Sequence, residues 1–319
     1  MASVLNELYF HDEQAAFRAL EAIVWPEGKP TCPHCGGTER INRLAPQRSK
    51  PSKKHPEGKA VYGLWKCYQC KGQFTARKNT VFASSHLELR QWLQAAFLLC
   101  SSKKGISSNQ LARTLGVTVK TAWFASHRLR EAMRTGGLAP MGGAGKIVES
   151  DETYIGRLTG VQKSKHGPSH KNVVLTLVER GGSARSFHID STALENVVPI
   201  VRQNVHRESR LMTDEGRHYI RLGREFAEHG SVEHTADEYV RGDIHTNTVE
   251  GFYSIFKRGM KGIYQHCKER HLHRYLAEFD FRYNNRVKLG VDDKARTAKA
   301  LSGIVGKRLT YRDSSAGRA

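Results

Sequence analysis

Four of the six cysteines stand in two pairs with the spacing of a metal site. The first pair is Cys32 and Cys35, the second is Cys67 and Cys70, and 31 residues separate the pairs. A gap of two residues lets both sulfurs of one turn face a single ion, and four thiolates close a tetrahedral site around Zn²⁺. Protein fills all four positions, so we expect this zinc to be structural. The alternative is two unrelated pairs of reduced cysteines.

Three carboxylates occupy positions from which they can bind a second kind of metal. Asp151 lies in a predicted strand, Asp214 follows the apolar strand 211–213, and Glu250 opens a predicted helix. Hard oxygen ligands suit Mg²⁺ or Mn²⁺, and two aspartates with a glutamate can hold a pair of such ions. Each acid also has a simpler explanation: an exposed strand residue, a helix cap, and a capping box with Asn247.

A helical hairpin is predicted between residues 106 and 134, with a turn at Gly116 and a cap at Thr118. The early residues of its second helix, Lys120 and Thr121, would lie toward base edges. Phosphate contacts are expected from three later residues of that helix, which are His127, Arg128 and Arg130. An ordinary pair of packed helices with a basic, solvated face is the alternative.

The charge of the chain indicates a polyanionic partner. Among 319 residues, 51 Lys and Arg face 31 Asp and Glu, which gives a net charge of +20. The longest apolar stretch, residues 92–100, is too short to span a bilayer, and acids occupy the place of an apolar signal segment near Met1. We therefore expect a cytoplasmic protein with no membrane partner, whose thiols stay reduced.

The remaining sequence predicts how these groups are positioned. Five glycines and a proline between residues 135 and 145 indicate a linker. Beyond it, strands followed by alternating helix and strand predict an α/β domain with a mixed sheet flanked by helices. The predicted divisions are an N-terminal helical segment, a zinc ribbon, a helix-turn-helix region, a catalytic domain and a basic C-terminal tail, at 1–28, 29–80, 81–135, 146–290 and 291–319.

These motifs together resemble a known family. The carrying residues are the cysteine pairs, the run 151–156, Asp214 with Glu215, and the run 245–252 with Lys257. They are similar to the zinc-ribbon insertion-sequence transposases of the ISXO-like group, within the Asp-Asp-Glu transposase and integrase superfamily. The resemblance covers roughly residues 15 to 290. Arg157 departs from it, because a second glycine usually follows Gly156.

The resemblance implies a ribonuclease-H-like catalytic fold in which Asp151, Asp214 and Glu250 bind the metal. Asn247 and His245 are further candidates beside that site. It also implies phosphoryl transfer on double-stranded DNA, both transposon ends and target, by a homo-oligomer assembled on the DNA. The basic residues expected to grip the DNA backbone near the site are Lys257, Arg258 and Lys261.

Two other functions fit the same residues. A DNA-binding regulator without enzymatic activity needs only the ribbon and the hairpin. A ribonuclease-H-like nuclease that cuts without joining uses the same ligands as a transposase.

Overall fold

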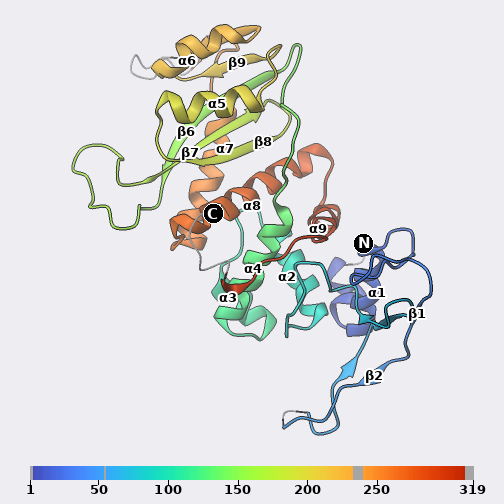
Figure 1. The fold of residues 1–319 in the computed structure, drawn as a ribbon. Coiled ribbons are helices and arrows are strands. Elements are labelled where there is room, and N and C mark those ends of the chain that lie inside the picture. Colours follow the sequence, from blue (N-terminus) through green and yellow to red (C-terminus); the bar gives the residue numbers. More distant parts are fainter. Residues whose placement is uncertain (1–2, 54, 233–239, 313–319) are drawn as a thin grey trace. The chain divides into compact units, whose positions relative to one another are not determined.

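The computed structural model describes residues 3–53, 55–232 and 240–312, which form two compact units (Figure 1). Unit 1 contains residues 3–101, 108–133 and 293–312. Unit 2 contains residues 102–107 and the described part of 134–292. The chain enters unit 2 briefly at residues 102–107, enters it again at residue 134 just before the glycine-rich segment 135–145, and returns to unit 1 after Asp292.

Helices form most of unit 1, and α2 packs against α1, α4 and α9. Large apolar side chains at helical spacing fill the space between them, and Leu20, Trp92, Leu99 and Leu129 are almost fully buried. The helices are α1 (Glu13–Val24), α2 (Leu89–Ser101), α3 (Ser108–Leu115), α4 (Val119–Met133) and α9 (Asp293–Ser302), with short 3₁₀ turns at Val4–Asn6 and Leu8–Phe10.

Helix α9 lies in the segment for which the sequence predicted a basic tail. Its apolar side chains Ala300 and Leu301 are buried, and Arg296 donates from Nη1 to the carbonyl oxygen of Cys100 at 2.9 Å. Beyond α9, residue 304 pairs with residue 81, and Lys307 donates to the carbonyl of Ala132. This segment is therefore part of unit 1 up to residue 312, and the last seven residues lie outside the described chain.

The cysteine-containing part of unit 1 is built from very short strands. An antiparallel sheet has the order β1, β4, β5, and a separate hairpin pairs β2 with β3. The strands are β1 (Ile41–Arg43), β2 (Gln47–Arg48), β3 (Ala60–Val61), β4 (Trp65–Cys67) and β5 (Gln73–Phe74). Among the described residues of this part, the core cluster consists of Cys32, Cys67 and Phe74, with Trp25, Ile41 and Trp65 packed against it. So small a core needs a further constraint to be stable.

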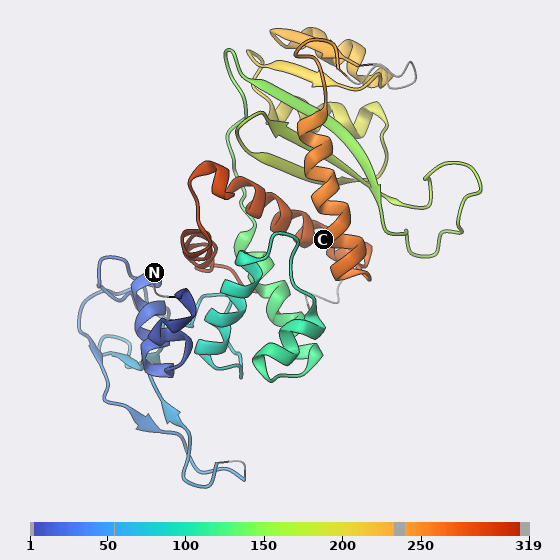
Figure 2. The same cartoon turned by 180° about the vertical axis from the view of Figure 1, so that it is seen from behind.

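A five-stranded mixed sheet forms the centre of unit 2, as the sequence predicted (Figures 1 and 2). Its order is β10, β9, β6, β7, β8. The three strands β6, β7 and β8 are antiparallel neighbours, while β9 and β10 continue the sheet in parallel. The strands are β6 (Ile147–Ile155), β7 (Asn172–Glu179), β8 (Ala184–Ile189), β9 (Arg210–Thr213) and β10 (Glu228–Ser231).

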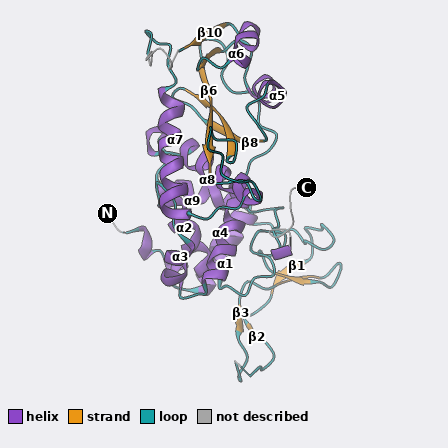
Figure 3. Ribbon diagram, turned by 90° about the vertical axis from the view of Figure 1, so that its left-hand side faces the viewer, coloured by secondary structure: helices purple, strands orange, loops and turns teal. Residues whose placement is uncertain are grey.

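Helices cover both faces of this sheet, as its nearly edge-on view shows (Figure 3). Side chains alternate along a strand, so Val148 faces the core under α5 and α6, whereas Ile155 faces the core under α7 and α8. The helices are α5 (Leu194–Asn204), α6 (Arg217–Leu222), α7 (Asn247–Gly259) and α8 (Leu272–Asn284), with short turns at Gly223–Glu225, Met260–Tyr264, Glu269–His271 and Val287–Leu289.

A half-buried carboxylate fastens α8 to the sheet. Asp280 accepts hydrogen bonds from the backbone nitrogen of Ser186 at 2.8 Å and from its hydroxyl at 2.6 Å. Desolvation is the main reason that the pKa of Asp280 rises to about 6, although both hydrogen bonds oppose the rise.

Candidate metal centres and nucleic-acid interface

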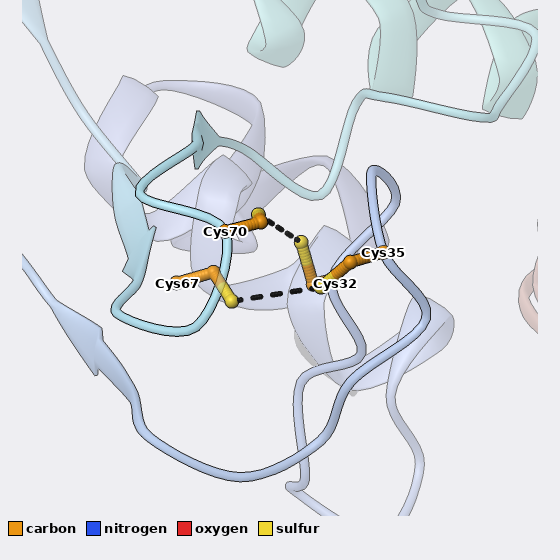
Figure 4. Close-up of side chains that lie close together, drawn as sticks. All are labelled: Cys32, Cys35, Cys67 and Cys70. Carbon is orange, nitrogen blue, oxygen red and sulfur yellow. Dashed lines mark hydrogen bonds between the residues drawn. The ribbon is translucent and has the colours of Figure 1, made fainter.

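The four paired cysteines converge on one point in unit 1 (Figure 4). The sulfurs of Cys32 and Cys70 are 3.6 Å apart, and those of Cys35 and Cys67 are 3.8 Å apart. A zinc ion with bonds of about 2.3 Å to four sulfurs places those sulfurs roughly 3.8 Å apart. The cluster therefore has the dimensions of a closed tetrahedral zinc site.

The backbone favours thiolates at Cys32 and Cys67, whereas at Cys35 the hydrogen bond from the Gly37 amide is outweighed by desolvation and the neighbouring thiols, which raise the pKa of Cys35 to about 12. Burial opposes ionisation of Cys32, but the backbone N–H groups of Cys35 and His34 outweigh it and lower the pKa of Cys32 to about 6. The pKa of Cys67 is likewise lowered, chiefly by the backbone N–H of Cys70. In both cysteine turns the backbone amides point at the sulfur and stabilise the thiolate. The thiolate is the charge state that Zn²⁺ binds.

Two of the predicted acidic residues meet at the edge of β6 in unit 2. Strand β9 runs parallel to β6 with Ile147 opposite Arg210 and Glu149 opposite Met212. The same register, continued past the end of β9, brings Asp214 level with Asp151. Both side chains are half-buried, and one ligand oxygen from each lies within 4.8 Å of the other.

Glu152 joins this pair, although the sequence analysis did not select it. Its carboxylate lies within 4.8 Å of both Asp151 and Asp214. The buried hydroxyl of Tyr219, on α6, donates to Glu152 at 2.6 Å and also lies 2.7 Å from the hydroxyl of Ser150. The side chains of Asp151 and Glu152 leave β6 toward opposite faces of the sheet. Because β9 ends before this point, β6 has an open edge here that both side chains can reach.

Glu250 lies in the first turn of α7, outside this 4.8 Å group. Its side chain is exposed, and Oε1 accepts a hydrogen bond from the hydroxyl of Thr246 at 2.9 Å. It still acts on the cluster electrostatically, because its charge contributes to the raised pKa of Asp151. The hydroxyl of Tyr253 on α7 also donates to the backbone oxygen of Asp151 at 2.5 Å, so α7 contacts the strand that bears Asp151.

The gathered acids repel one another in the absence of a cation. Burial first, and then the charges of Glu152 and Asp214, raise the pKa of Asp151 to about 8. A carboxyl held partly protonated beside two other acids is the expected state of a divalent cation site without its ion. Oxygen ligands at this spacing fit Mg²⁺ or Mn²⁺.

Basic residues of α7 and the turn after it accompany the acids. Lys257 is half-buried, and desolvation lowers its pKa although the charge of Asp151 opposes the shift. Its ammonium nitrogen lies 5.8 Å from the ring centre of Tyr253. Arg258 and Lys261 are exposed.

The two remaining candidates precede Glu250 along the chain. Asn247 is exposed at the start of α7, and His245 is half-buried just before it. His245 lies outside the group formed by Asp151, Glu152 and Asp214.

In unit 1, the predicted hairpin consists of α3 and α4 joined by a turn at Gly116, whose φ of 65° is left-handed. Thr118 caps α4 by accepting a hydrogen bond from the nitrogen of Thr121 at 3.2 Å. Lys120 and Thr121 are exposed, as a reading position requires.

Three residues expected at the surface of α4 are buried instead. His127, Arg128 and Arg130 have exposed fractions of 0%, 4% and 1%. Arg128 donates to the carbonyl of Ala83 and lies over the ring of Trp92. These side chains are therefore not available to phosphates, because α4 packs against both α2 and α9.

None of the helices in the described part of the chain combines the length and the apolar composition needed to cross a lipid bilayer.

Known proteins match both regions. The family model of the ISXO2-like transposase domain matches residues 142–284, and that of the transposase zinc-ribbon domain matches residues 11–73. The chain is also 27% identical over 294 residues to an uncharacterized protein in transposable element ISH50 of Halobacterium salinarum, covering 86% of this chain and 91% of that protein. The four cysteines lie in the second matched region and the acids in the first. By these matches the chain combines a transposase zinc-ribbon domain with an ISXO2-like transposase domain.

Proposed function

We propose that this protein is a DNA transposase that binds the ends of an insertion sequence, cuts DNA strands there and joins them to target DNA. The convergence of Asp151, Glu152 and Asp214 at one sheet edge is the observation that carries the proposal. The mixed sheet with helices on both faces agrees with a ribonuclease-H-like catalytic domain. The family of both matched regions supports the same conclusion.

In this proposal Asp151 and Asp214 hold Mg²⁺ or Mn²⁺, Glu152 adds a third carboxylate, and Glu250 completes the site from α7. These carboxylates would hold a divalent pair, which would supply activation of the attacking water or 3′-hydroxyl and stabilisation of the leaving oxygen. Lys257 lies on the same helix as Glu250 and balances the negative charge of the phosphodiester. The protein itself supplies no nucleophile.

The hairpin of unit 1 is proposed to act as a helix-turn-helix with α4 as the reading helix. Lys120 and Thr121 are exposed at its N-terminal end, where such helices contact base edges. Arg258 and Lys261 of unit 2 contact the DNA backbone without selecting sequence. An insertion sequence has two ends, so we infer that at least two copies act together on the DNA.

The test uses purified protein and labelled DNA that carries the ends of its own element. Cleavage and joining are measured with Mg²⁺ or Mn²⁺ for wild type and for Asp151→Ala, Asp214→Ala, Glu152→Gln and Glu250→Ala. Glu195→Gln is the matched control, because Glu195 is an exposed acid in the first turn of α5, outside the cluster.

We expect the four site variants to bind end DNA but to lose cleavage by at least a hundredfold, while Glu195→Gln keeps wild-type activity. Wild-type protein that binds the ends but never cuts would replace the proposal with a DNA-binding regulator. Wild-type protein that cuts both end DNA and target DNA but never joins them would reduce the proposed function to that of a nuclease.

A further inference from the structure

Glu149 is a fully buried carboxylate to which the proposed chemistry gives no role. Its side chain has an exposed fraction of 0%. It lies on β6 two residues before Asp151, and the two side chains therefore share the face that is covered by α7. A buried charge is tolerated only where partners replace the water that it has lost.

Its partners are the first turn of α7. Glu149 accepts hydrogen bonds from the backbone nitrogens of Thr248 and Val249 at 2.8 and 2.9 Å, and from the hydroxyl of Thr248 at 2.8 Å. These are the second and third residues of the helix, whose amides a capping side chain normally satisfies. A negative charge at this end also interacts favourably with the helix dipole.

The cap comes from a distant strand because the local residue is used elsewhere. Thr246 occupies the cap position but accepts no capping hydrogen bond, and its hydroxyl donates to Glu250 instead. The capping carboxylate is about a hundred residues away in sequence. One side chain therefore joins the strand that bears Asp151 to the helical turn that bears Glu250.

Arg180 completes the arrangement. Its Nε donates to Glu149 at 2.5 Å and balances the buried charge. Its two terminal nitrogens donate to the carbonyl oxygens of Asp243 and His245 at 2.8 and 2.9 Å, which fixes the segment leading into α7. Nδ1 of His245 lies 3.0 Å from Arg180 and 3.3 Å from the nitrogen of Asn247 and accepts from both.

We propose that Glu149 and Arg180 form a clasp that sets the position of Glu250 relative to Asp151. Both are positioning residues, because their hydrogen-bonding atoms contact the protein and not the open edge where the acids gather. His245 then serves this clasp and not the metal. The proposal rests on the proposed function for its catalytic consequence, but its structural consequence is measurable without DNA.

The main variant is Glu149→Gln, which keeps the shape and one acceptor oxygen but removes the charge. Thr248→Val is a milder variant that removes only the hydroxyl contact. Glu179→Gln is the matched control, because Glu179 is a partly buried acid on the neighbouring strand β7 whose carboxylate pairs with Lys146 and accepts from the backbone nitrogen of Gly142. Thermal unfolding of each variant confirms that it folds.

The first readout is hydrogen exchange of the Thr248 and Val249 amides in metal-free protein, and the second is Mn²⁺ affinity by titration calorimetry. The clasp predicts at least tenfold faster exchange at both amides and a tenfold to hundredfold weaker Mn²⁺ affinity in Glu149→Gln, with smaller changes in Thr248→Val. Glu179→Gln should match wild type in both. If Glu149→Gln matches Glu179→Gln in exchange and affinity, the clasp is refuted.

The third readout separates this proposal from the transposase assignment. If wild type cleaves end DNA, the clasp predicts a tenfold to hundredfold lower kcat for Glu149→Gln with unchanged KM for DNA, and a smaller loss with Mn²⁺, which tolerates imperfect ligand geometry better than Mg²⁺. If kcat falls equally with Mg²⁺ and with Mn²⁺ and the Tm of Glu149→Gln is lowered, the clasp is reduced to a general stabilising contact. If wild type does not cleave, the transposase proposal fails, while exchange and Mn²⁺ affinity still decide the clasp.

Discussion

Removal of zinc should unfold the cysteine-containing part of unit 1 and leave the helices of that unit folded. The ribbon has one buried aromatic residue, Phe74, and two buried cysteines in its core. Full burial of one large apolar side chain contributes about 1.5–3 kcal/mol. A structural zinc bound by thiolates contributes about 10–16 kcal/mol near neutral pH. The metal term is therefore several times larger than the apolar term, and the ribbon cannot persist without it.

The position of the tryptophans provides the assay. All four lie in unit 1: Trp25 and Trp65 pack against the cysteine cluster, whereas Trp92 and Trp123 lie on α2 and α4. A strong chelator should therefore shift only part of the tryptophan emission to longer wavelength. Far-UV circular dichroism should keep most of its helical signal, because α2, α3 and α4 have their own apolar core.

Two variants make the experiment decisive. Wild type and Cys267→Ser should each release one zinc per chain after thiol modification, because Cys267 lies in unit 2, outside the cluster. Cys35→Ser should lose most of its zinc and emit like the chelated protein. A zinc-free wild type with unchanged tryptophan emission would refute the reasoning, since it would show that the ribbon folds without metal.

Three further results are expected. Lys120→Ala should weaken binding to end DNA and lower the slope of DNA affinity against salt concentration by about one counterion. Arg128→Ala should leave that slope unchanged and cost about 1–3 kcal/mol of stability in urea unfolding. Asp280 has a folded-state pKa of about 6, above its unfolded value, so the folded state binds the extra proton. Wild type should lose about 3 kcal/mol of stability relative to Asp280→Asn as the pH rises from about 4 to 7. The loss should appear as faster hydrogen exchange of the β7 and β8 amides. A stability difference between the two proteins that does not change with pH would contradict this. Tyr219→Phe removes the hydroxyl that donates to Glu152 and should weaken Mn²⁺ binding about tenfold; unchanged calorimetric affinity would show that Glu152 needs no such support.

The sequence was sufficient where local patterns determine position. The cysteine spacing by itself predicted the cluster that the structure shows. The aspartate after an apolar strand predicted that Asp214 would join Asp151 at a metal site, and the two carboxylates lie within 4.8 Å of each other. Whether Glu250 completes the metal site stays a prediction.

Residues that depend on distant partners could not be found this way. Glu152 was missed because alternation directs it away from Asp151, and only the early end of β9 lets the two converge. Glu149 has partners about a hundred residues away. The basic residues of α4 were assigned to the surface because nothing in the local pattern shows that α9 would cover that helix.

The return of the chain to unit 1 affects how damage to the gene would act. A stop codon or frameshift after residue 292 leaves the whole segment that matches the transposase domain intact. It nevertheless deletes α9 and the pairing of residue 304 with residue 81. Such a truncated copy would retain Asp151, Glu152 and Asp214 but destabilise the unit that carries the cysteine cluster and the hairpin. On the proposed function, decay of the gene from its 3′ end should therefore abolish recognition of DNA ends before it removes any of the gathered acids.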